Sequence, residues 1–144
     1  MNSLPQASPR VYAEQWIANW NRKDVEAVLA HFSEDVVFTS PRAASIMSST
    51  RLDGKAKLRE YWTRALAQIR TIQFALDYVI RDGDRLSIVY TAEMDGKRIR
   101  AVEFLVFGSD GLIHQGEGMY AQTSERDRVA AIPGANSFPI LTGN

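Results

Sequence analysis

Two side chains of this sequence have the chemistry needed to move a proton, and both fall in its last third. Glu103 lies within the apolar segment AVEFLVF, and His114 follows the turn segment GSDG. A carboxyl group among apolar neighbours loses hydration, so we expect burial to raise the pKa of Glu103 toward neutrality. A group of this kind can act as a general acid or base, or donate a hydrogen bond to an oxyanion. Glu103 and His114 are therefore the candidate catalytic residues.

Both residues also have a structural interpretation. Glu103 could be a buried carboxyl group that pairs with a tryptophan N–H or a tyrosine hydroxyl. His114 comes directly after a turn, where a half-exposed histidine without a catalytic role is the more ordinary assignment. The histidines, His31 and His114, lack metal-ligand spacing, and the chain has no cysteine, so we expect no metal site. No phosphate-binding glycine motif is present, and we expect no cofactor.

Composition limits the possible partners of the protein. The chain has 144 residues, of which 45% are hydrophobic, and its 17 basic residues balance 17 acidic ones. Basic residues are dispersed, so we expect no nucleic-acid partner, and no apolar run has the length of a membrane span. Without an apolar signal core near the N-terminus, the expected location is cytoplasmic. We expect an N-terminal extension (1–8), a single domain (9–122) and a C-terminal tail (123–144).

The order of the expected elements is three helices followed by antiparallel strands, which is an α+β class. Ser8-Pro9 is a helix-start signal, Asp24 can cap a second helix, and a short strand over 36–40 ends at Pro41. Residues 42–52 show no periodicity and are expected to form a loop. A third helix follows over about 55–70. After it the apolar period changes to two, which predicts strands starting at residue 72 and near 85–94, 97–107 and 112–122.

Turn signals predict which strand residues lie opposite one another. A two-residue loop at Asp95-Gly96 pairs Met94 with Lys97 and, further along, Ile88 with Glu103. A similar count around residues 108–111 pairs Leu105 with His114 and Glu103 with Gly116, which would bring His114 diagonally next to Glu103. Glu103 then shares a sheet face with Tyr90, Gly118 and Tyr120, and the small residues on this face leave space for a ligand. The two faces could also be reversed.

The segments WIANWN, DVEAVLAHF, EDVVFTSP and the strand pair joined by GSDG resemble the NTF2-like superfamily, in its SnoaL-like and ketosteroid-isomerase-like branch. The resemblance covers residues 9–122. It implies an NTF2-like (cystatin-like) cone, in which a strongly curved antiparallel sheet wraps the N-terminal helices around a hydrophobic pocket. It often implies a homodimer through the outer face of the sheet.

The resemblance also shows what this sequence lacks. Ketosteroid isomerases place an aspartate base directly before a proline at the end of the first strand, where this chain has Ser40. Their tyrosines fall on Trp16, Phe32 and Trp62, and only their second carboxyl group is kept, at Glu103. Serine does not abstract a carbon-bound proton unaided, so steroid isomerisation is not expected. SnoaL-like cyclases use an acidic residue in the pocket, which Glu103 could supply.

The sequence therefore predicts a site but leaves its activity open. The pocket is expected to hold a small apolar ligand and to be lined by Trp16, Trp20, Phe32, Phe38, Ser40, Trp62, Tyr90, Gly118 and Tyr120. One possibility is an isomerase-, cyclase- or hydrolase-type enzyme that transfers a proton at Glu103. The other is a non-catalytic dimeric module that binds a ligand or a partner. Loop 42–52 could close the pocket with Ile46 and Met47 or be a mobile connector, and the apolar tail is expected to pack on the body or on a dimer partner.

Overall fold

The structure of the protein is a computed structural model, and it describes residues 8–121. Helix α1 (Pro9–Asn21) begins where Ser8 caps it, the Ser8 hydroxyl accepting the Val11 N–H. Helix α2 (Val25–Leu29) begins in the same way at Asp24, whose carboxylate accepts the Ala27 N–H. Both helix starts were predicted from the capping residues, and both predictions are confirmed.

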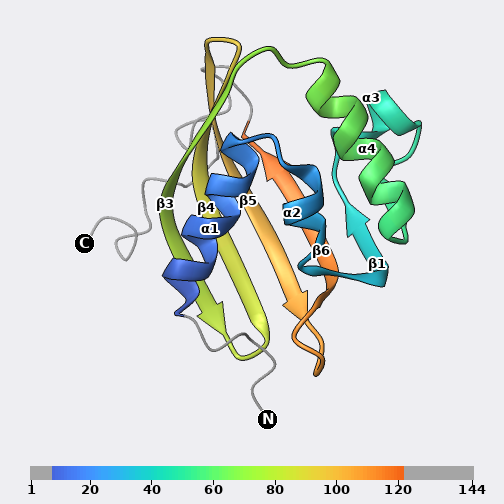
Figure 1. The fold of residues 1–144 in the computed structure, drawn as a ribbon, viewed down its shortest axis with the longest axis vertical. Coiled ribbons are helices and arrows are strands. Elements are labelled where there is room, and N and C mark those ends of the chain that lie inside the picture. Colours follow the sequence, from blue (N-terminus) through green and yellow to red (C-terminus); the bar gives the residue numbers. More distant parts are fainter. Residues whose placement is uncertain (1–7, 122–144) are drawn as a thin grey trace, which may run out of the picture.

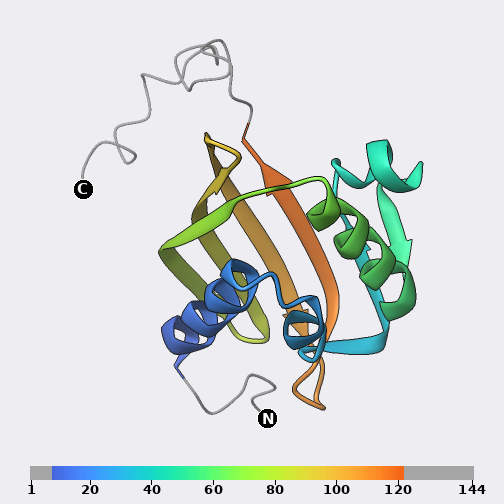
Figure 2. The same cartoon turned by 45° about the horizontal axis from the view of Figure 1, so that its top comes forward.

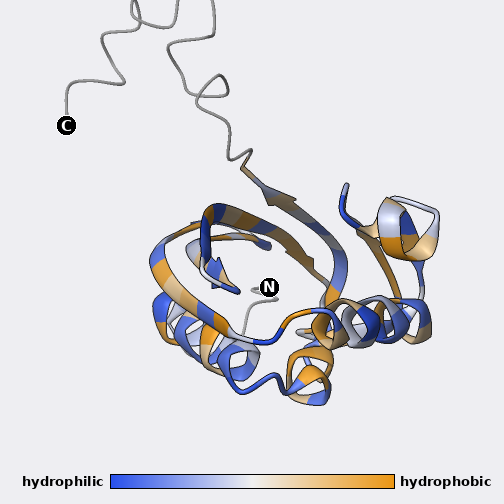
Figure 3. Cartoon of the chain, turned by 90° about the horizontal axis from the view of Figure 1, so that it is seen from above, coloured by the Kyte–Doolittle hydropathy of each residue, from blue (hydrophilic) through white to orange (hydrophobic). Residues whose placement is uncertain are grey.

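The strands form one six-stranded sheet in the order β2-β1-β6-β5-β4-β3. Their bounds are β1 (Phe32–Thr39), β2 (Arg51–Asp53), β3 (Ile72–Asp82), β4 (Arg85–Met94), β5 (Lys97–Phe107) and β6 (Ile113–Tyr120). All neighbouring strands are antiparallel except β1 and β6, which are parallel. The sheet bends strongly, and α1 lies across its concave side in front of β4 and β5 (Figures 1 and 3). The predicted α+β cone is confirmed.

The segment 42–52 is folded, which corrects the expected loop. Helix α3 (Ala43–Met47) and strand β2 occupy it, and Leu52 on β2 pairs with Phe38 on β1. Helix α3 has no side-chain cap and no apolar periodicity, so the sequence does not mark it. Its packing in the fold supports it, since Ala43 is fully buried. Helix α4 (Lys55–Ala67) follows and lies beside β1, at the opposite side of the sheet opening from α1 (Figure 2).

The predicted register between β4 and β5 is confirmed, from Met94 opposite Lys97 to Ile88 opposite Glu103. The register between β5 and β6 was predicted wrongly by two residues, because Glu103 lies opposite Gly118 and Leu105 opposite Gly116. The loop has five residues, Gly108–Leu112, closed by a hydrogen bond from Gly108 N–H to the Leu112 carbonyl, and a bulge at the start of β6 adds another residue. Beyond the bulge, a shift of two keeps Gly116, Gly118 and Tyr120 on their predicted face.

The expected N-terminal extension and C-terminal tail fall almost wholly outside the described residues. Among the described residues, no helix is both long and apolar enough to cross a membrane.

Candidate functional site

Glu103 lies in the middle of the sheet, at the concave side of β5. Its neighbours across the sheet are Ile88 on β4 and Gly118 on β6. The side chain is 5% exposed, and its Oε2 atom accepts a hydrogen bond from the Tyr90 hydroxyl at 3.2 Å. Oε1 is buried and has no hydrogen-bond partner among the described residues. One of the two oxygen atoms of this carboxyl group is therefore without a partner in this part of the chain.

Burial raises the pKa of Glu103 to about 8, and the hydrogen bond from Tyr90 acts in the opposite direction. Desolvation penalises the carboxylate more than the neutral acid, so the acid form persists at neutral pH. In that form the side chain carries a proton that it can donate to an oxygen atom of a bound molecule. The raised pKa predicted from the sequence agrees with this direction.

Gly118 gives this carboxyl group the space it occupies. A Cβ atom at Gly118 would lie 2.9 Å from Oε2 and 3.3 Å from Oε1 of Glu103. These separations are shorter than ordinary van der Waals contact, so any other residue at this position would push the carboxyl group away. The absence of a side chain on β6 thus fixes where Glu103 can point.

Three tyrosines surround Glu103. Burial raises the pKa values of Tyr90, Tyr61 and Tyr120, so their hydroxyl groups stay protonated and remain hydrogen-bond donors. The charge of Glu103 contributes to the pKa of all three, which places them within electrostatic reach of its carboxyl group. The Tyr61 hydroxyl lies 3.3 Å from Ser40 Oγ.

A cavity of about 300 Å³ opens beside this group, at the lower end of the size range of small-molecule sites. Its walls come from α1, α3, α4 and the concave side of the sheet. The lining residues are Trp16, Trp20, Arg42, Ser45, Ile46, Tyr61, Trp62, Ala65, Leu66, Gln68, Ile69, Ile72, Phe74, Tyr90, Met94, Glu103 and Tyr120. The Nε1–H groups of Trp16 and Trp20 are buried without partners among the described residues, so they are two further unused donors.

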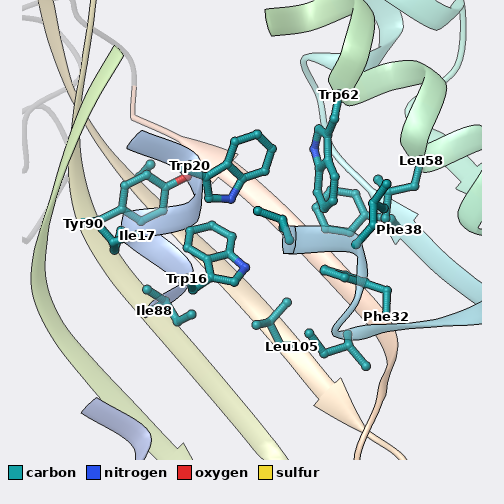
Figure 4. Close-up of a cluster of buried hydrophobic side chains, with 14 of the residues drawn as sticks. Trp16, Ile17, Trp20, Phe32, Phe38, Leu58, Trp62, Ile88, Tyr90 and Leu105 are labelled. Carbon is teal, nitrogen blue, oxygen red and sulfur yellow. The ribbon is translucent and has the colours of Figure 1, made fainter. Parts of the chain in front are cut away.

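Aromatic side chains from α1, α4, β1, β3 and β4 form one connected cluster, most of which is shown in Figure 4. Trp20 packs edge-on against Trp62 with ring centroids 5.0 Å apart, and Trp62 contacts Phe32 and Phe38, each at 5.4 Å. This cluster holds α1 against α4 and β1 through ring contacts that favour one geometry. The apolar wall of the cavity is therefore built from rigid residues.

The structure places the predicted pocket residues in two groups. Trp16, Trp20, Trp62, Tyr90 and Tyr120 line the cavity together with Glu103. The others lie behind its walls, which corrects their assignment as lining residues: Phe32, Phe38, Ser40 and Gly118. They are covered by residues nearer the cavity. Trp62 packs over both phenylalanines, Tyr61 bonds Ser40, and Glu103 fills the space next to Gly118.

His114 does not lie next to Glu103, which corrects the diagonal contact predicted from the register. Its Nε2 atom is 3.0 Å from both carboxylate oxygens of Asp110, and its Nδ1 atom is 3.5 Å from Asp35. A Cβ atom at Gly108 would collide with the imidazole ring, so the glycine lets the ring close over the loop. The bulge at the start of β6 moves His114 to this position, at the far end of the strand from Tyr120.

Sequence reasoning missed four polar residues of the cavity, Arg42, Ser45, Tyr61 and Gln68. Tyr61 falls on the same helical stripe as Leu58 and Ala65, so the period of α4 could have identified it. Arg42 belongs to a segment without periodicity, and no pattern marked it. Ile46 was expected at the pocket mouth and does line the cavity.

Among the described residues, no group of three or more carboxylate or histidine side chains could hold a metal ion.

Comparisons with known proteins agree with this geometry. The family model of the SnoaL-like domain matches residues 13–115. A SnoaL-like protein of unknown function from Burkholderia thailandensis is 28% identical, with a TM-score of 0.74 over 83% of this chain and 98% of that one. No curated protein matches the sequence significantly.

Two more distant structures share the fold. A candidate ketosteroid isomerase from Kribbella flavida is 20% identical, with a TM-score of 0.64 over 81% of this chain and 80% of the other. A candidate polyketide cyclase from Sinorhizobium meliloti is 16% identical, with a TM-score of 0.59 over 72% of this chain and 88% of the other. At these identities the likeness concerns the fold alone.

Proposed function

The chain belongs to the SnoaL-like domain family, and from that premise we propose that it is an enzyme in which Glu103 donates a proton to a carbonyl oxygen of a small, mostly apolar substrate. One observation carries the proposal: a buried carboxyl group with a pKa of about 8 lines an apolar cavity, and its Oε1 atom has no partner among the described residues. Buried polar groups normally find partners, so an unused one at a cavity wall is suited to a ligand.

The reaction that fits this donor set is an addition to a carbonyl group. When a nucleophilic enol carbon bonds to the carbonyl carbon, negative charge develops on the carbonyl oxygen, and the Glu103 proton neutralises it. The enol hydroxyl gives up its proton as its own C=O bond forms, and the Glu103 carboxylate accepts that proton. The catalyst is thereby restored without a cofactor. Ring closure within one molecule is the form of this reaction that a cavity of about 300 Å³ favours, since both reacting groups arrive together.

Carbon-acid isomerisation is less well supported. This reaction needs a protein carboxylate that removes a proton from a substrate carbon. In this chain Ser40, directly after β1, occupies the position where ketosteroid isomerases have that carboxylate. Ser40 is 2% exposed, lies behind the cavity wall and bonds the Tyr61 hydroxyl. A buried hydroxyl in this environment cannot take a proton from carbon unaided.

Turnover tests this proposal. Purified protein is incubated with a panel of small diketones that are already partly enolised in water and can close a ring, and products are measured by mass spectrometry and NMR. We expect Glu103→Gln to lower the rate by about 10²–10⁴-fold, which is the usual contribution of general acid catalysis. The matched control is Glu117→Gln, which changes an exposed carboxylate on the other face of β6. Diketones that bind to the wild type without turnover would instead support the alternative of a non-catalytic ligand-binding module.

We also propose that two copies pair through the outer face of the sheet. Four large apolar side chains are exposed on that face: Tyr78, Ile80, Phe104 and Met119. Soluble monomers rarely expose such a contiguous patch, and a second copy of the same face would cover it. Sedimentation of the wild type and of Phe104→Lys tests this proposal, with a dimer expected for the first and a monomer for the second. The cytoplasmic location stays a prediction from the sequence.

A further inference from the structure

Among the described residues, Arg42 is the one arginine or lysine that lines the cavity. The other ionisable side chains of this part of the chain that line it are Glu103 and three tyrosines, Tyr61, Tyr90 and Tyr120. Glu103 and the tyrosines are neutral at pH 7, because burial raises the pKa of each of them. The lining formed by residues 8–121 therefore carries a net charge of about +1, and all of it is on the guanidinium group of Arg42.

No carboxylate of the described residues neutralises this charge. The ion pairs of the described residues involve other arginines, for example Arg64 with Glu60 and Arg59 with Glu26. The guanidinium group of Arg42 lies 4.3 Å from the centroid of the Tyr120 ring and stacks on its face. Stacking fixes the plane of the group and leaves its N–H donors free to bind.

Arg42 and Glu103 give one cavity a charged outer end and a neutral, buried inner end. Arg42 directly precedes α3 and is exposed to solvent, whereas Glu103 is buried on β5. Tyr61 and Tyr120 line the same cavity and are within electrostatic reach of both groups, since the charges of Arg42 and Glu103 each contribute to the pKa of both tyrosines. Trp16, Trp20 and Trp62 supply an apolar wall along the same space. A molecule that fits would have an acceptor oxygen at its inner end and a negative charge at its outer end.

We propose that Arg42 binds a carboxylate group of the substrate and thereby selects monoanionic carbonyl compounds over neutral ones. A guanidinium group matches a carboxylate with two parallel hydrogen bonds. A single arginine balances one negative charge, so a carboxylate fits better than a doubly charged phosphate ester. The proposal deepens the proposed function, because it adds the substrate class of the same site, and it does not require that Glu103 transfer a proton.

A pair of probes that differ in charge and by one methyl group tests this inference. The probes are 4-acetylbenzoate and its methyl ester, which share a ring and a ketone. Binding is followed through the fluorescence of Trp16, Trp20 and Trp62, which line the cavity. We expect the wild type to bind the acid about tenfold or more tightly than the ester, as a charge-assisted bidentate contact would give. Arg42→Gln should abolish this preference, and Arg42→Lys should keep part of it.

The control is Arg64→Gln, which removes another exposed arginine from α4 that does not line the cavity and pairs with Glu60. It should keep the full preference for the acid. Two results would overturn the inference: a wild type that does not prefer the acid, including one that binds neither probe, or a preference that survives Arg42→Gln. The outcome is separate from the test of catalysis. A preference for the acid that Arg42→Gln abolishes supports the role of Arg42 whether or not Glu103→Gln lowers turnover. Loss of turnover in Glu103→Gln without any preference for the acid supports the role of Glu103 alone.

Discussion

Glu103 on β5 and Gly118 on β6 are direct cross-strand partners, and the glycine lacks a side chain where the carboxyl group lies. A methyl group at Gly118 would come within 2.9 Å of Oε2 and 3.3 Å of Oε1. The depth and direction of the only buried carboxyl group among the described residues therefore depend on one missing Cβ atom.

Gly118→Ala should displace the Glu103 carboxyl group and break its hydrogen bond from Tyr90. Forcing a methyl group into a packed wall costs about 1–3 kcal/mol of stability. Gly116→Ala is the matched control, because its Cβ atom would approach the Phe38 ring at 2.7 Å rather than the carboxyl group. Urea denaturation should show a loss for both variants, and NMR titration should show an altered Glu103 pKa only for Gly118→Ala. Equal titration curves in the two variants would contradict this assignment.

The raised pKa of Glu103 makes stability depend on pH. The folded protein holds the proton up to about pH 8, whereas the unfolded chain releases it near the ordinary value of 4.5. Between these values the folded state binds more protons, so stability falls as pH rises. The contribution of Glu103 to stability is fully present below pH 4.5 and is lost between pH 4.5 and about pH 8. The total loss of stability is about 5 kcal/mol, at roughly 1.4 kcal/mol per pH unit.

Glu103→Gln checks this expectation, because glutamine stays neutral at every pH. Denaturant titrations of the two proteins across pH 5–9 should diverge, with the wild type losing stability relative to the variant as pH rises. The difference between the two curves isolates Glu103 from other titrating groups. Parallel curves would show that the carboxyl group has an ordinary pKa.

Tyr90→Phe should raise the pKa of Glu103 further. The Tyr90 hydroxyl donates to Oε2, and this hydrogen bond favours the carboxylate and lowers the pKa. Tyr61→Phe is the comparison, since the Tyr61 hydroxyl bonds Ser40 rather than the carboxyl group. NMR spectra of protein with ¹³C-labelled glutamate side chains report both titrations. A Glu103 midpoint that moves downward in Tyr90→Phe would exclude the role given to this hydrogen bond.

Strong local signals explain the parts of the fold that the sequence could predict. Asp95 and Gly96 both have positive φ values, 51° and 84°, as a two-residue hairpin turn needs, so the count from Met94 outward placed Glu103 opposite Ile88 correctly. The loop between β5 and β6 has five residues and an added bulge, and neither has a sequence signature of comparable strength. The error of two residues kept Glu103 on the concave face and misplaced only its partners.

The candidate site was predictable where it rests on helical periodicity and not where it rests on tertiary packing. Trp16 and Trp20 lie at helical spacing on α1, and Trp62 lies at helical spacing from Leu58 on α4, which identified them in advance. The position of Arg42 depends on its contact with the Tyr120 ring, and the position of α3 depends on the burial of its residue Ala43. No local sequence pattern encodes either of these. The charged outer end of the cavity, at Arg42, could therefore be identified only in the folded chain.

Asn21, the last residue of α1, links this helix to the edge strand β3 of the sheet. Its Nδ2–H donates to the Phe74 carbonyl at 3.0 Å, and its Oδ1 accepts the Phe74 N–H at 2.6 Å. Strand β3 is an edge strand, so these two backbone groups have no neighbouring strand on that side. The same contact holds Trp20 near the Phe74 ring, at 6.3 Å between centroids, and both side chains line the cavity.

Asn21→Ala should therefore lower stability by about 1–3 kcal/mol, because two hydrogen bonds are lost and two backbone groups are left unpaired. Asn19→Ala is the control, since the Asn19 amide oxygen bonds only the exposed Arg22 side chain and should change stability by no more than about 0.5 kcal/mol. Chemical denaturation followed by tryptophan fluorescence measures both. The structural link between α1 and β3 would be refuted if the two variants were equally stable.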